Sequence, residues 1–147
     1  MTTEEPILDS PTAWVRDHIR EYVESDGQNG HLWRGIPTLL LTTRGRKSGL
    51  LRRTALIYGQ SGPDYLIVAS NGGSKDHPLW YLNLSQDPQV EIQVEALKFT
   101  AHARTATPEE KQRLWPIMAK IFPTYDRYLV TAAQAGRDIP LVILSPL

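Results

Sequence analysis

The chain has 147 residues, a formal net charge of zero and no cysteine. This length suits one domain with a sizeable core, and the balanced charge offers no general attraction to nucleic acid or anionic lipid. The lack of cysteine excludes disulfides, thiolate zinc sites, iron–sulfur clusters and cysteine nucleophiles. Neither a signal peptide nor an apolar run near the ~20 residues of a membrane span is visible, so a cytoplasmic protein is expected.

The first predicted element is a helix from Pro11 to about Ser25, with Ser10 as its N-cap. Its apolar side predicts packing on the domain, and an amphipathic surface on a membrane or a partner is the alternative. After an irregular glycine-rich stretch, short β-branched and alternating runs predict six strands. These are TLLLTT (38–43), TALIY (54–58), YLIVAS (65–70), VEIQV (90–94), KFTAHART (98–105) and IPLVIL (139–144).

Three more helices are predicted between these strands. The first is short and covers 78–86, and the second opens with the capping box TPEE at 107–110. Pro116 should kink this second helix, and Thr124 is expected to cap the third. Strands joined by short turns, with helices inserted late, favour one α+β domain whose antiparallel sheet must close or be covered. Six strands suit a small barrel.

The stretch TTRGRKSGLLRR (42–53) concentrates positive charge in one predicted hairpin turn. Five of the 16 Lys and Arg residues fall in its last ten positions, with no acid among them. Gly45 and Gly49 allow a ligand to approach the backbone closely, and convergent donors of this kind suit a phosphate. The spacing is not that of a nucleotide P-loop. From charge alone, an anion site is as good an interpretation as a solvated hairpin tip or a nucleic-acid contact.

The loop ASNGGSKDHP (69–78) leaves a strand and enters a helix, so it can present backbone amides, Ser70 or Asn71 to a planar polar ligand. The alternative is an ordinary glycine-rich connection. Tyr125 and Tyr128 follow a proline break and can wall a pocket. No paired histidines, carboxylate pair or serine triad is evident. The residues that metal catalysis or acid–base hydrolysis would require are therefore missing from the pattern. An enzyme would therefore rely on a cofactor.

Three segments together resemble one known family, the deazaflavin-dependent nitroreductases, which are actinobacterial reductases that use coenzyme F420. The segments are GRKSGLLR (45–52), VASNGGSKDHPLWYLNLSQDPQVEIQV (68–94) and TPEEKQRLWPIMAKIFPTYDRY (107–128). The resemblance covers roughly Gly35 to the C-terminus. It implies a split β-barrel of about six mainly antiparallel strands with flanking helices. An N-terminal helix and loop (1–34) would precede a single cofactor-binding domain (35–147).

The resemblance also implies which residues contact the cofactor. They are Arg46, Lys47 and Ser48; Arg52, Thr54, Ala55, Leu56 and Ile57; Val68, Ala69, Ser70 and Asn71; Leu79, Trp80, Tyr81 and Asn83; and Tyr125. Ser70, Tyr125 and Tyr128 are implied to act at the ring and the acceptor. Lys47 and Arg52, helped by Arg46, are expected to hold the phosphate of the cofactor as a phosphate clamp. Arg44 and Arg53 are expected to lie outside this clamp, and no metal site is expected.

The implied function is hydride transfer from reduced coenzyme F420 to a quinone-like or nitroaromatic acceptor. Two alternatives remain at this point: an FMN-binding oxidoreductase on the same barrel, and a non-catalytic binder of anions or nucleic acid. Peripheral membrane contact through the N-terminal helix is left open. Asn71 stands where the family often has lysine, and Ala55 and Ile57 replace a proline and an aromatic residue. The difference at Asn71 predicts a weaker grip on the polyglutamate tail of the cofactor, and those at Ala55 and Ile57 predict a smaller pocket wall.

Overall fold

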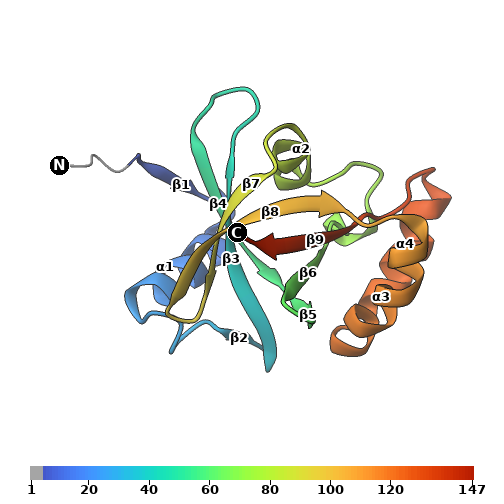
Figure 1. The fold of residues 1–147 in the computed structure, drawn as a ribbon, viewed down its shortest axis with the longest axis horizontal. Helices are drawn as coiled ribbons and strands as arrows, with labels where there is room; N and C mark the ends of the chain where they lie inside the picture. Colours follow the sequence, from blue (N-terminus) through green and yellow to red (C-terminus); the bar gives the residue numbers. More distant parts are fainter. Residues whose placement is uncertain (1–4) are drawn as a thin grey trace.

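The computed structural model describes residues 5–147 and shows a mixed sheet flanked by helices (Figure 1). Within this range there are nine strands, four α-helices and one 3₁₀ turn, η1. Their bounds are β1 Ile7–Asp9, α1 Ala13–Glu24, β2 Leu32–Trp33, β3 Ile36–Arg44, β4 Leu51–Ile57, β5 Gly59–Ser61, β6 Asp64–Val68, η1 Asn71–Gly73, α2 Leu79–Gln86, β7 Gln89–Val94, β8 Leu97–Thr105, α3 Pro108–Ile121, α4 Thr124–Gln134 and β9 Leu141–Pro146.

The strands form one path in the order β1-β4-β3-β7-β8-β9-β6-β5, with β2 paired to β3 outside it. The prediction of about six strands is corrected to nine, because β1, β2 and β5 are two or three residues long and too short to show an alternating pattern. The ladder of hydrogen bonds does not close into the expected barrel. Instead β4 pairs with β3 and β5 pairs with β6, and only Tyr58 separates β4 from β5. The covalent chain therefore bridges the gap at which the sheet remains open.

Alternation along β3 divides its leucines between two sides of the sheet. Leu39 and Leu41 lie in the inner core, whereas Leu40 packs outside against Ile19 and Tyr22 of α1. Both α1 side chains are fully buried, so the predicted packing of this helix on the domain is confirmed. The helix begins at Ala13 rather than Pro11, since β1 occupies the preceding residues and Thr12 is the N-cap.

The outer side of β6 and β9 is covered by α3 and α4, which Figure 1 shows together at the end of the molecule away from α1. The predicted capping box is confirmed: Thr107 and Glu110 exchange side-chain and backbone hydrogen bonds of 3.2 and 3.0 Å. Hydrogen bonds from Arg104 and the Thr107 amide lower the pKa of Glu110 to about 2. Thr124 is not a cap, because it is the first residue of α4 and Pro123 occupies the N-cap position.

Candidate functional site

The positive charges of the hairpin between β3 and β4 fall into two groups. Arg44 makes a bidentate ion pair with Glu5, and Arg53 makes one with Asp9 through Nε at 2.6 Å. The parallel pairing of β1 with β4 brings both carboxylates to this edge. Within residues 5–147 the remaining three cations have no carboxylate partner. They are Arg46, Lys47 and Arg52.

The backbone of this hairpin turn is fixed by hydrogen bonds between its own residues. The Gly45 amide donates to the Leu50 carbonyl and the Gly49 amide donates to the Gly45 carbonyl, both at 2.8 Å. A side chain at Gly45 would meet Ser48 Oγ at 2.8 Å and Arg52 Cγ at 3.7 Å, so Ser48 and the Arg52 stem lie together over this glycine. The turn therefore holds its free cations and a hydroxyl on a rigid frame.

The side chain of Asn83, on α2, holds this turn in place through hydrogen bonds. Its side chain is 6% exposed, accepts a hydrogen bond from the Arg46 amide at 3.1 Å and donates one to Thr43 Oγ1 at 3.3 Å. Both ends of the side-chain amide are thus engaged with protein. Asn83 lies where the resemblance implies a cofactor contact, but its observed partners belong to the turn, so it acts on the turn's conformation.

The loop after β6 takes an unusual backbone course. Ser70 is right-handed, and the next three residues, Asn71, Gly72 and Gly73, have φ of 47°, 64° and 78°. A right-handed residue followed by a left-handed one turns successive amides toward a common side and forms an anion-binding nest. The Asn71 side chain bonds within the loop, to Ser74 Oγ and the Asp76 carbonyl, each at 2.9 Å. The loop can therefore offer converging backbone donors.

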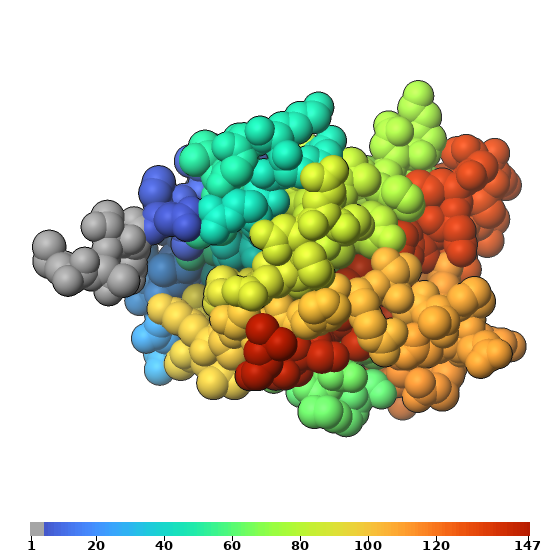
Figure 2. Space-filling view, turned by 45° about the horizontal axis from the view of Figure 1, so that its top comes forward, coloured from blue at the N-terminus to red at the C-terminus, as the bar shows by residue number. Residues whose placement is uncertain are grey.

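Figure 2 shows the hairpin turn, in teal, and the loop at 70–77, in light green, projecting on the same side of the molecule, with the yellow-green surface of α2 between them. Two of the implied contact segments thus face one region from opposite sides. Along α2 the implied contacts diverge: Leu79 is exposed, whereas Trp80 and Tyr81 pack on the inner core.

Successive residues of β4 face different parts of the molecule. Ala55 packs with the α1 cluster and Ile57 with the α3–α4 cluster, so these two lie on the outer side. Leu56 packs with the inner core, and Thr54, two residues earlier, shares its side of the strand. Their side chains cannot all line one groove. Among these four residues, only Ala55 and Ile57 have side chains on the helix-covered face.

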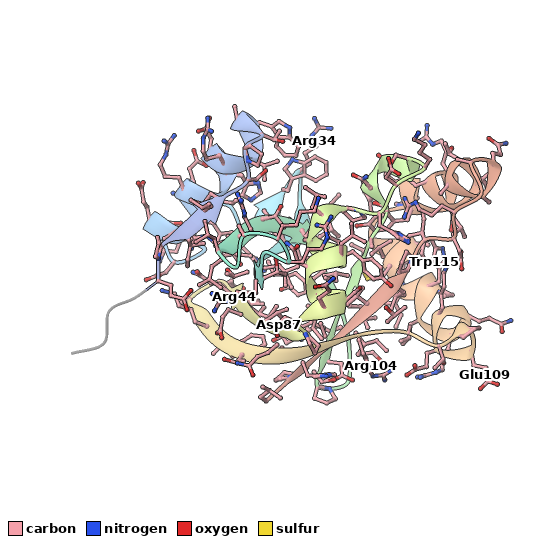
Figure 3. The ribbon with its side chains drawn as sticks, turned by 90° about the horizontal axis from the view of Figure 1, so that it is seen from above. Arg34, Arg44, Asp87, Arg104, Glu109 and Trp115 are labelled. Carbon is pink, nitrogen blue, oxygen red and sulfur yellow. The ribbon has the colours of Figure 1, made fainter. Side chains whose placement is uncertain are left out.

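An aromatic cluster lies on that face. Tyr125 packs against Phe122 at 5.0 Å and against Tyr128 at 6.5 Å between ring centroids. Phe122 also contacts Trp33 of β2 at 6.2 Å, and Trp33 stacks on Trp14 of α1 at 6.3 Å. Trp33 was not among the predicted site residues, because its place beside Phe122 depends on a long-range contact. Figure 3 labels Arg34, whose guanidinium lies 4.9 Å from the Trp33 ring.

Tyr125 is 5% exposed, and burial raises the pKa of its phenol well above the ordinary 10. The phenol is therefore protonated throughout the physiological range. Every enclosed side-chain polar atom of residues 5–147 has a hydrogen-bond partner. The Tyr125 hydroxyl makes no hydrogen bond to another residue of this range. The hydroxyl oxygen must therefore be accessible to solvent, and the group can donate a hydrogen bond to a ligand.

Arg137 is the main residue that sequence reasoning missed. It follows α4, is 7% exposed and donates to four acceptors of the 69–77 loop. The acceptors are Ala69 O at 3.0 Å, Ser70 O at 2.5 Å, Ser74 O at 2.8 Å and His77 Nδ1 at 3.0 Å. The only local signal is an arginine placed just before the buried run that starts at Ile139, and no motif marks it.

A separate hollow of about 850 Å³ lies near the end of α1. Its lining includes Glu21, Glu24 and Glu95, which makes it unsuitable for an anionic ligand.

No cluster of three metal-ligating side chains is found in residues 5–147. In the same range, no helix has both the length and the apolar character that crossing a membrane requires.

Comparison with known proteins adds independent findings. The family model for F420H(2)-dependent quinone reductase matches residues 14–146. F420H(2)-dependent quinone reductase Rv1261c of Mycobacterium tuberculosis is 38% identical over 134 residues, which are 89% of each chain. A solved structure described as a domain-swapped dimer has 34% identity and a TM-score of 0.70, over 92% of this chain and 100% of that one. An F420-H2 dependent reductase, FDR-A, has 33% identity and a TM-score of 0.67, over 74% and 94%.

Proposed function

Because the chain belongs to the F420H(2)-dependent quinone reductase family, we propose that it is an oxidoreductase that uses coenzyme F420 to reduce a quinone. At the level of residues, one observation carries this function: Arg46, Lys47 and Arg52 are left without carboxylate partners in residues 5–147, while Arg44 and Arg53 are neutralised. Three free cations on a bonded turn provide the convergent donors that a phosphate group requires.

The donors of the site fit the chemistry of coenzyme F420. Lys47 and Arg52, assisted by Arg46, would hold the phosphate of its side chain, and Ser48 adds a hydroxyl beside them. The nest at Ser70 would orient the polar edge of the ring through backbone amides. When bound, the coenzyme supplies a hydride from C5 of its reduced deazaflavin ring.

The acceptor would lie against the aromatic cluster. Tyr125 and Tyr128 would wall its pocket, with Phe122 and Trp33 behind them. The Tyr125 hydroxyl keeps its proton because burial disfavours the phenolate, so it can donate a hydrogen bond to an acceptor oxygen as negative charge develops there. The surrounding apolar side chains exclude water from the transfer. A nitroaromatic compound would occupy the same face.

We assign the curled, unclosed sheet to the split-barrel type, with residues 35–147 as the cofactor-binding unit. The N-terminal segment at 5–34 adds β1 to its edge and α1 to its outer face. This segment also supplies Glu5 and Asp9, so it determines which arginines of the hairpin remain free.

A quinone is lipid-soluble, so contact of the protein with a membrane surface would assist access. Ile19 and Tyr22 of α1 are buried in the fold, and the exposed apolar side chain left on that helix is Trp14. We expect the fraction that co-sediments with anionic lipid vesicles to fall in Trp14→Ala relative to wild type. Equal sedimentation of both proteins, or of neither, would remove the proposed contact.

The function itself is tested by mixing the protein with reduced coenzyme F420 and a panel of quinones, nitro compounds and enones. We expect quinone-dependent oxidation of the coenzyme, which is measured as the return of deazaflavin absorbance. Parallel titrations with oxidised coenzyme F420 and with FMN distinguish the cofactors. Binding of FMN alone would favour the flavin alternative, and no turnover with any acceptor would leave only a cofactor-binding protein.

A further inference from the structure

The feature with no assigned role is Arg137, a buried guanidinium without a carboxylate partner in residues 5–147. A buried charge is costly unless hydrogen bonds satisfy it. Here the compensation comes entirely from one segment, the loop at 69–77, which lies sixty or more residues earlier in the chain. This is the loop whose nest would face the ring of the cofactor.

We propose that Arg137 is a positioning residue of the cofactor site, which aims the amides of Ser70 and Asn71 at the ligand and holds His77 as a donor at Nε2. The inference rests on the proposed function, because the ligand that receives these donors is coenzyme F420. Arg137 itself does not contact the coenzyme in this arrangement.

The aiming follows from peptide geometry. In a trans peptide the carbonyl and the amide N–H of one plane point in opposite directions. Arg137 binds the carbonyls of Ala69 and Ser70, at 3.0 and 2.5 Å. The N–H groups of the same two peptides, which belong to Ser70 and Asn71, therefore point away from Arg137. These are the donors that begin the nest, so the guanidinium determines the side on which the nest opens.

The state of His77 follows from the donor chemistry of arginine. A guanidinium has five N–H donors and no acceptor, so His77 Nδ1 must accept the 3.0 Å hydrogen bond from Arg137 Nη1. The ring proton is then on Nε2. Burial lowers the pKa of His77 most, and the positive charge of Arg137 lowers it further. The negative charge of Asp76 opposes this shift. The Tyr81 ring also packs against His77, with 4.9 Å between the two ring centroids.

The same loop is held from a second direction. A side chain at Gly73 would lie 3.0 Å from the Tyr128 carbonyl oxygen and 3.1 Å from the Tyr128 Cα. The loop thus lies directly on the backbone of α4, and Arg137 extends into it from just beyond the end of that helix. The nest and the acceptor tyrosines are therefore held in one arrangement.

The test compares Arg137→Lys and Arg137→Met with an exposed-arginine control, Arg113→Met. Lysine keeps the charge but has only three N–H donors, so it cannot serve the four acceptors. We expect Arg137→Lys to fold and to bind oxidised coenzyme F420 about tenfold more weakly by fluorescence titration, because the misaligned loop would lose about one charge-assisted hydrogen bond to the ligand. Arg113→Met should bind as wild type does.

Two readouts do not depend on turnover. In wild type, long-range 1H–15N spectra of labelled histidine should show His77 with its proton on Nε2, and both tautomers should appear in Arg137→Lys. Hydrogen exchange at residues 70–76 should accelerate in the same variant. A wild-type tautomer, wild-type exchange and wild-type affinity in Arg137→Lys would overturn the inference, even if Arg137→Met fails to fold. Absence of F420 binding by wild type would instead refute the proposed function, which separates the two failures.

Discussion

Replacing Lys47 by alanine should weaken the binding of oxidised coenzyme F420 by about tenfold to a hundredfold, since a charge-assisted contact to phosphate contributes about 1.5–3 kcal/mol. Lys47 is exposed and has no ion pair within residues 5–147, so its charge is available to a ligand. Fluorescence titration measures the loss. The specificity among acceptors should change little, because the turn lies apart from the aromatic cluster in the proposed site.

The matched control for this prediction is Arg53→Ala, which removes a charge of the same sign from the same hairpin. Arg53 is already neutralised by Asp9, so the affinity for the coenzyme should stay at the wild-type value. Equal losses in Lys47→Ala and Arg53→Ala would mean that the turn acts only through its total charge. Unchanged affinity in Lys47→Ala would remove the turn from the site.

Replacing Gly73 by alanine should lower the free energy of unfolding by about 2–5 kcal/mol. The left-handed φ of 78° costs a residue with a Cβ about 1–2 kcal/mol, and overpacking a tight contact adds about 1–3 kcal/mol. The added Cβ would meet the backbone of Tyr128 at 3.0–3.1 Å, and backbone cannot move aside as a flexible side chain can. The loop must then shift away from α4, so affinity for the coenzyme should also fall. Urea denaturation and titration measure the two effects.

Gly72→Ala provides the comparison at the neighbouring position. Gly72 also has a left-handed backbone, with φ of 64°, but no atom lies within 4 Å of an added Cβ. Only the conformational cost of about 1–2 kcal/mol is therefore expected. The difference between the two variants isolates the contact with Tyr128. If Gly72→Ala proves as damaging as Gly73→Ala, backbone strain alone explains both, and the loop does not depend on α4.

Local chemistry made several elements predictable. The capping box at 107–110 was read correctly because both partners of its hydrogen bonds lie within one turn of chain. The strands at 90–94 and 98–105 were recognised by their strict alternation, and they pair as β7 and β8. Prediction failed where two neighbouring elements compete for the same residues, as at the start of α1. Ser10 does not cap α1, because β1 draws the chain into the sheet until Asp9.

The sequence by itself determined the family, and with it the cofactor, because GRKSG, the WYLNL helix start and the tyrosines form a combination that can be recognised without a fold. It also led us to expect that Arg44 and Arg53 lie outside the proposed phosphate clamp. Only the tertiary structure shows that both arginines are neutralised, by Asp9 at the end of the parallel strand β1 and by Glu5 just before that strand. An ion pair between residues 39 or 44 positions apart leaves no periodic or spacing pattern in a chain.

The same limit applies to the residues that position the loop. Arg137 reaches carbonyl groups more than sixty residues earlier, and a backbone acceptor has no residue identity that a sequence could display. Trp33 joins the aromatic cluster only because β2 folds back along β3 and places it beside Phe122. Sequence therefore indicated which chemical groups the proposed site contains, and tertiary packing decided which of them remain without an ion-pair partner in residues 5–147 and which hold the others in place.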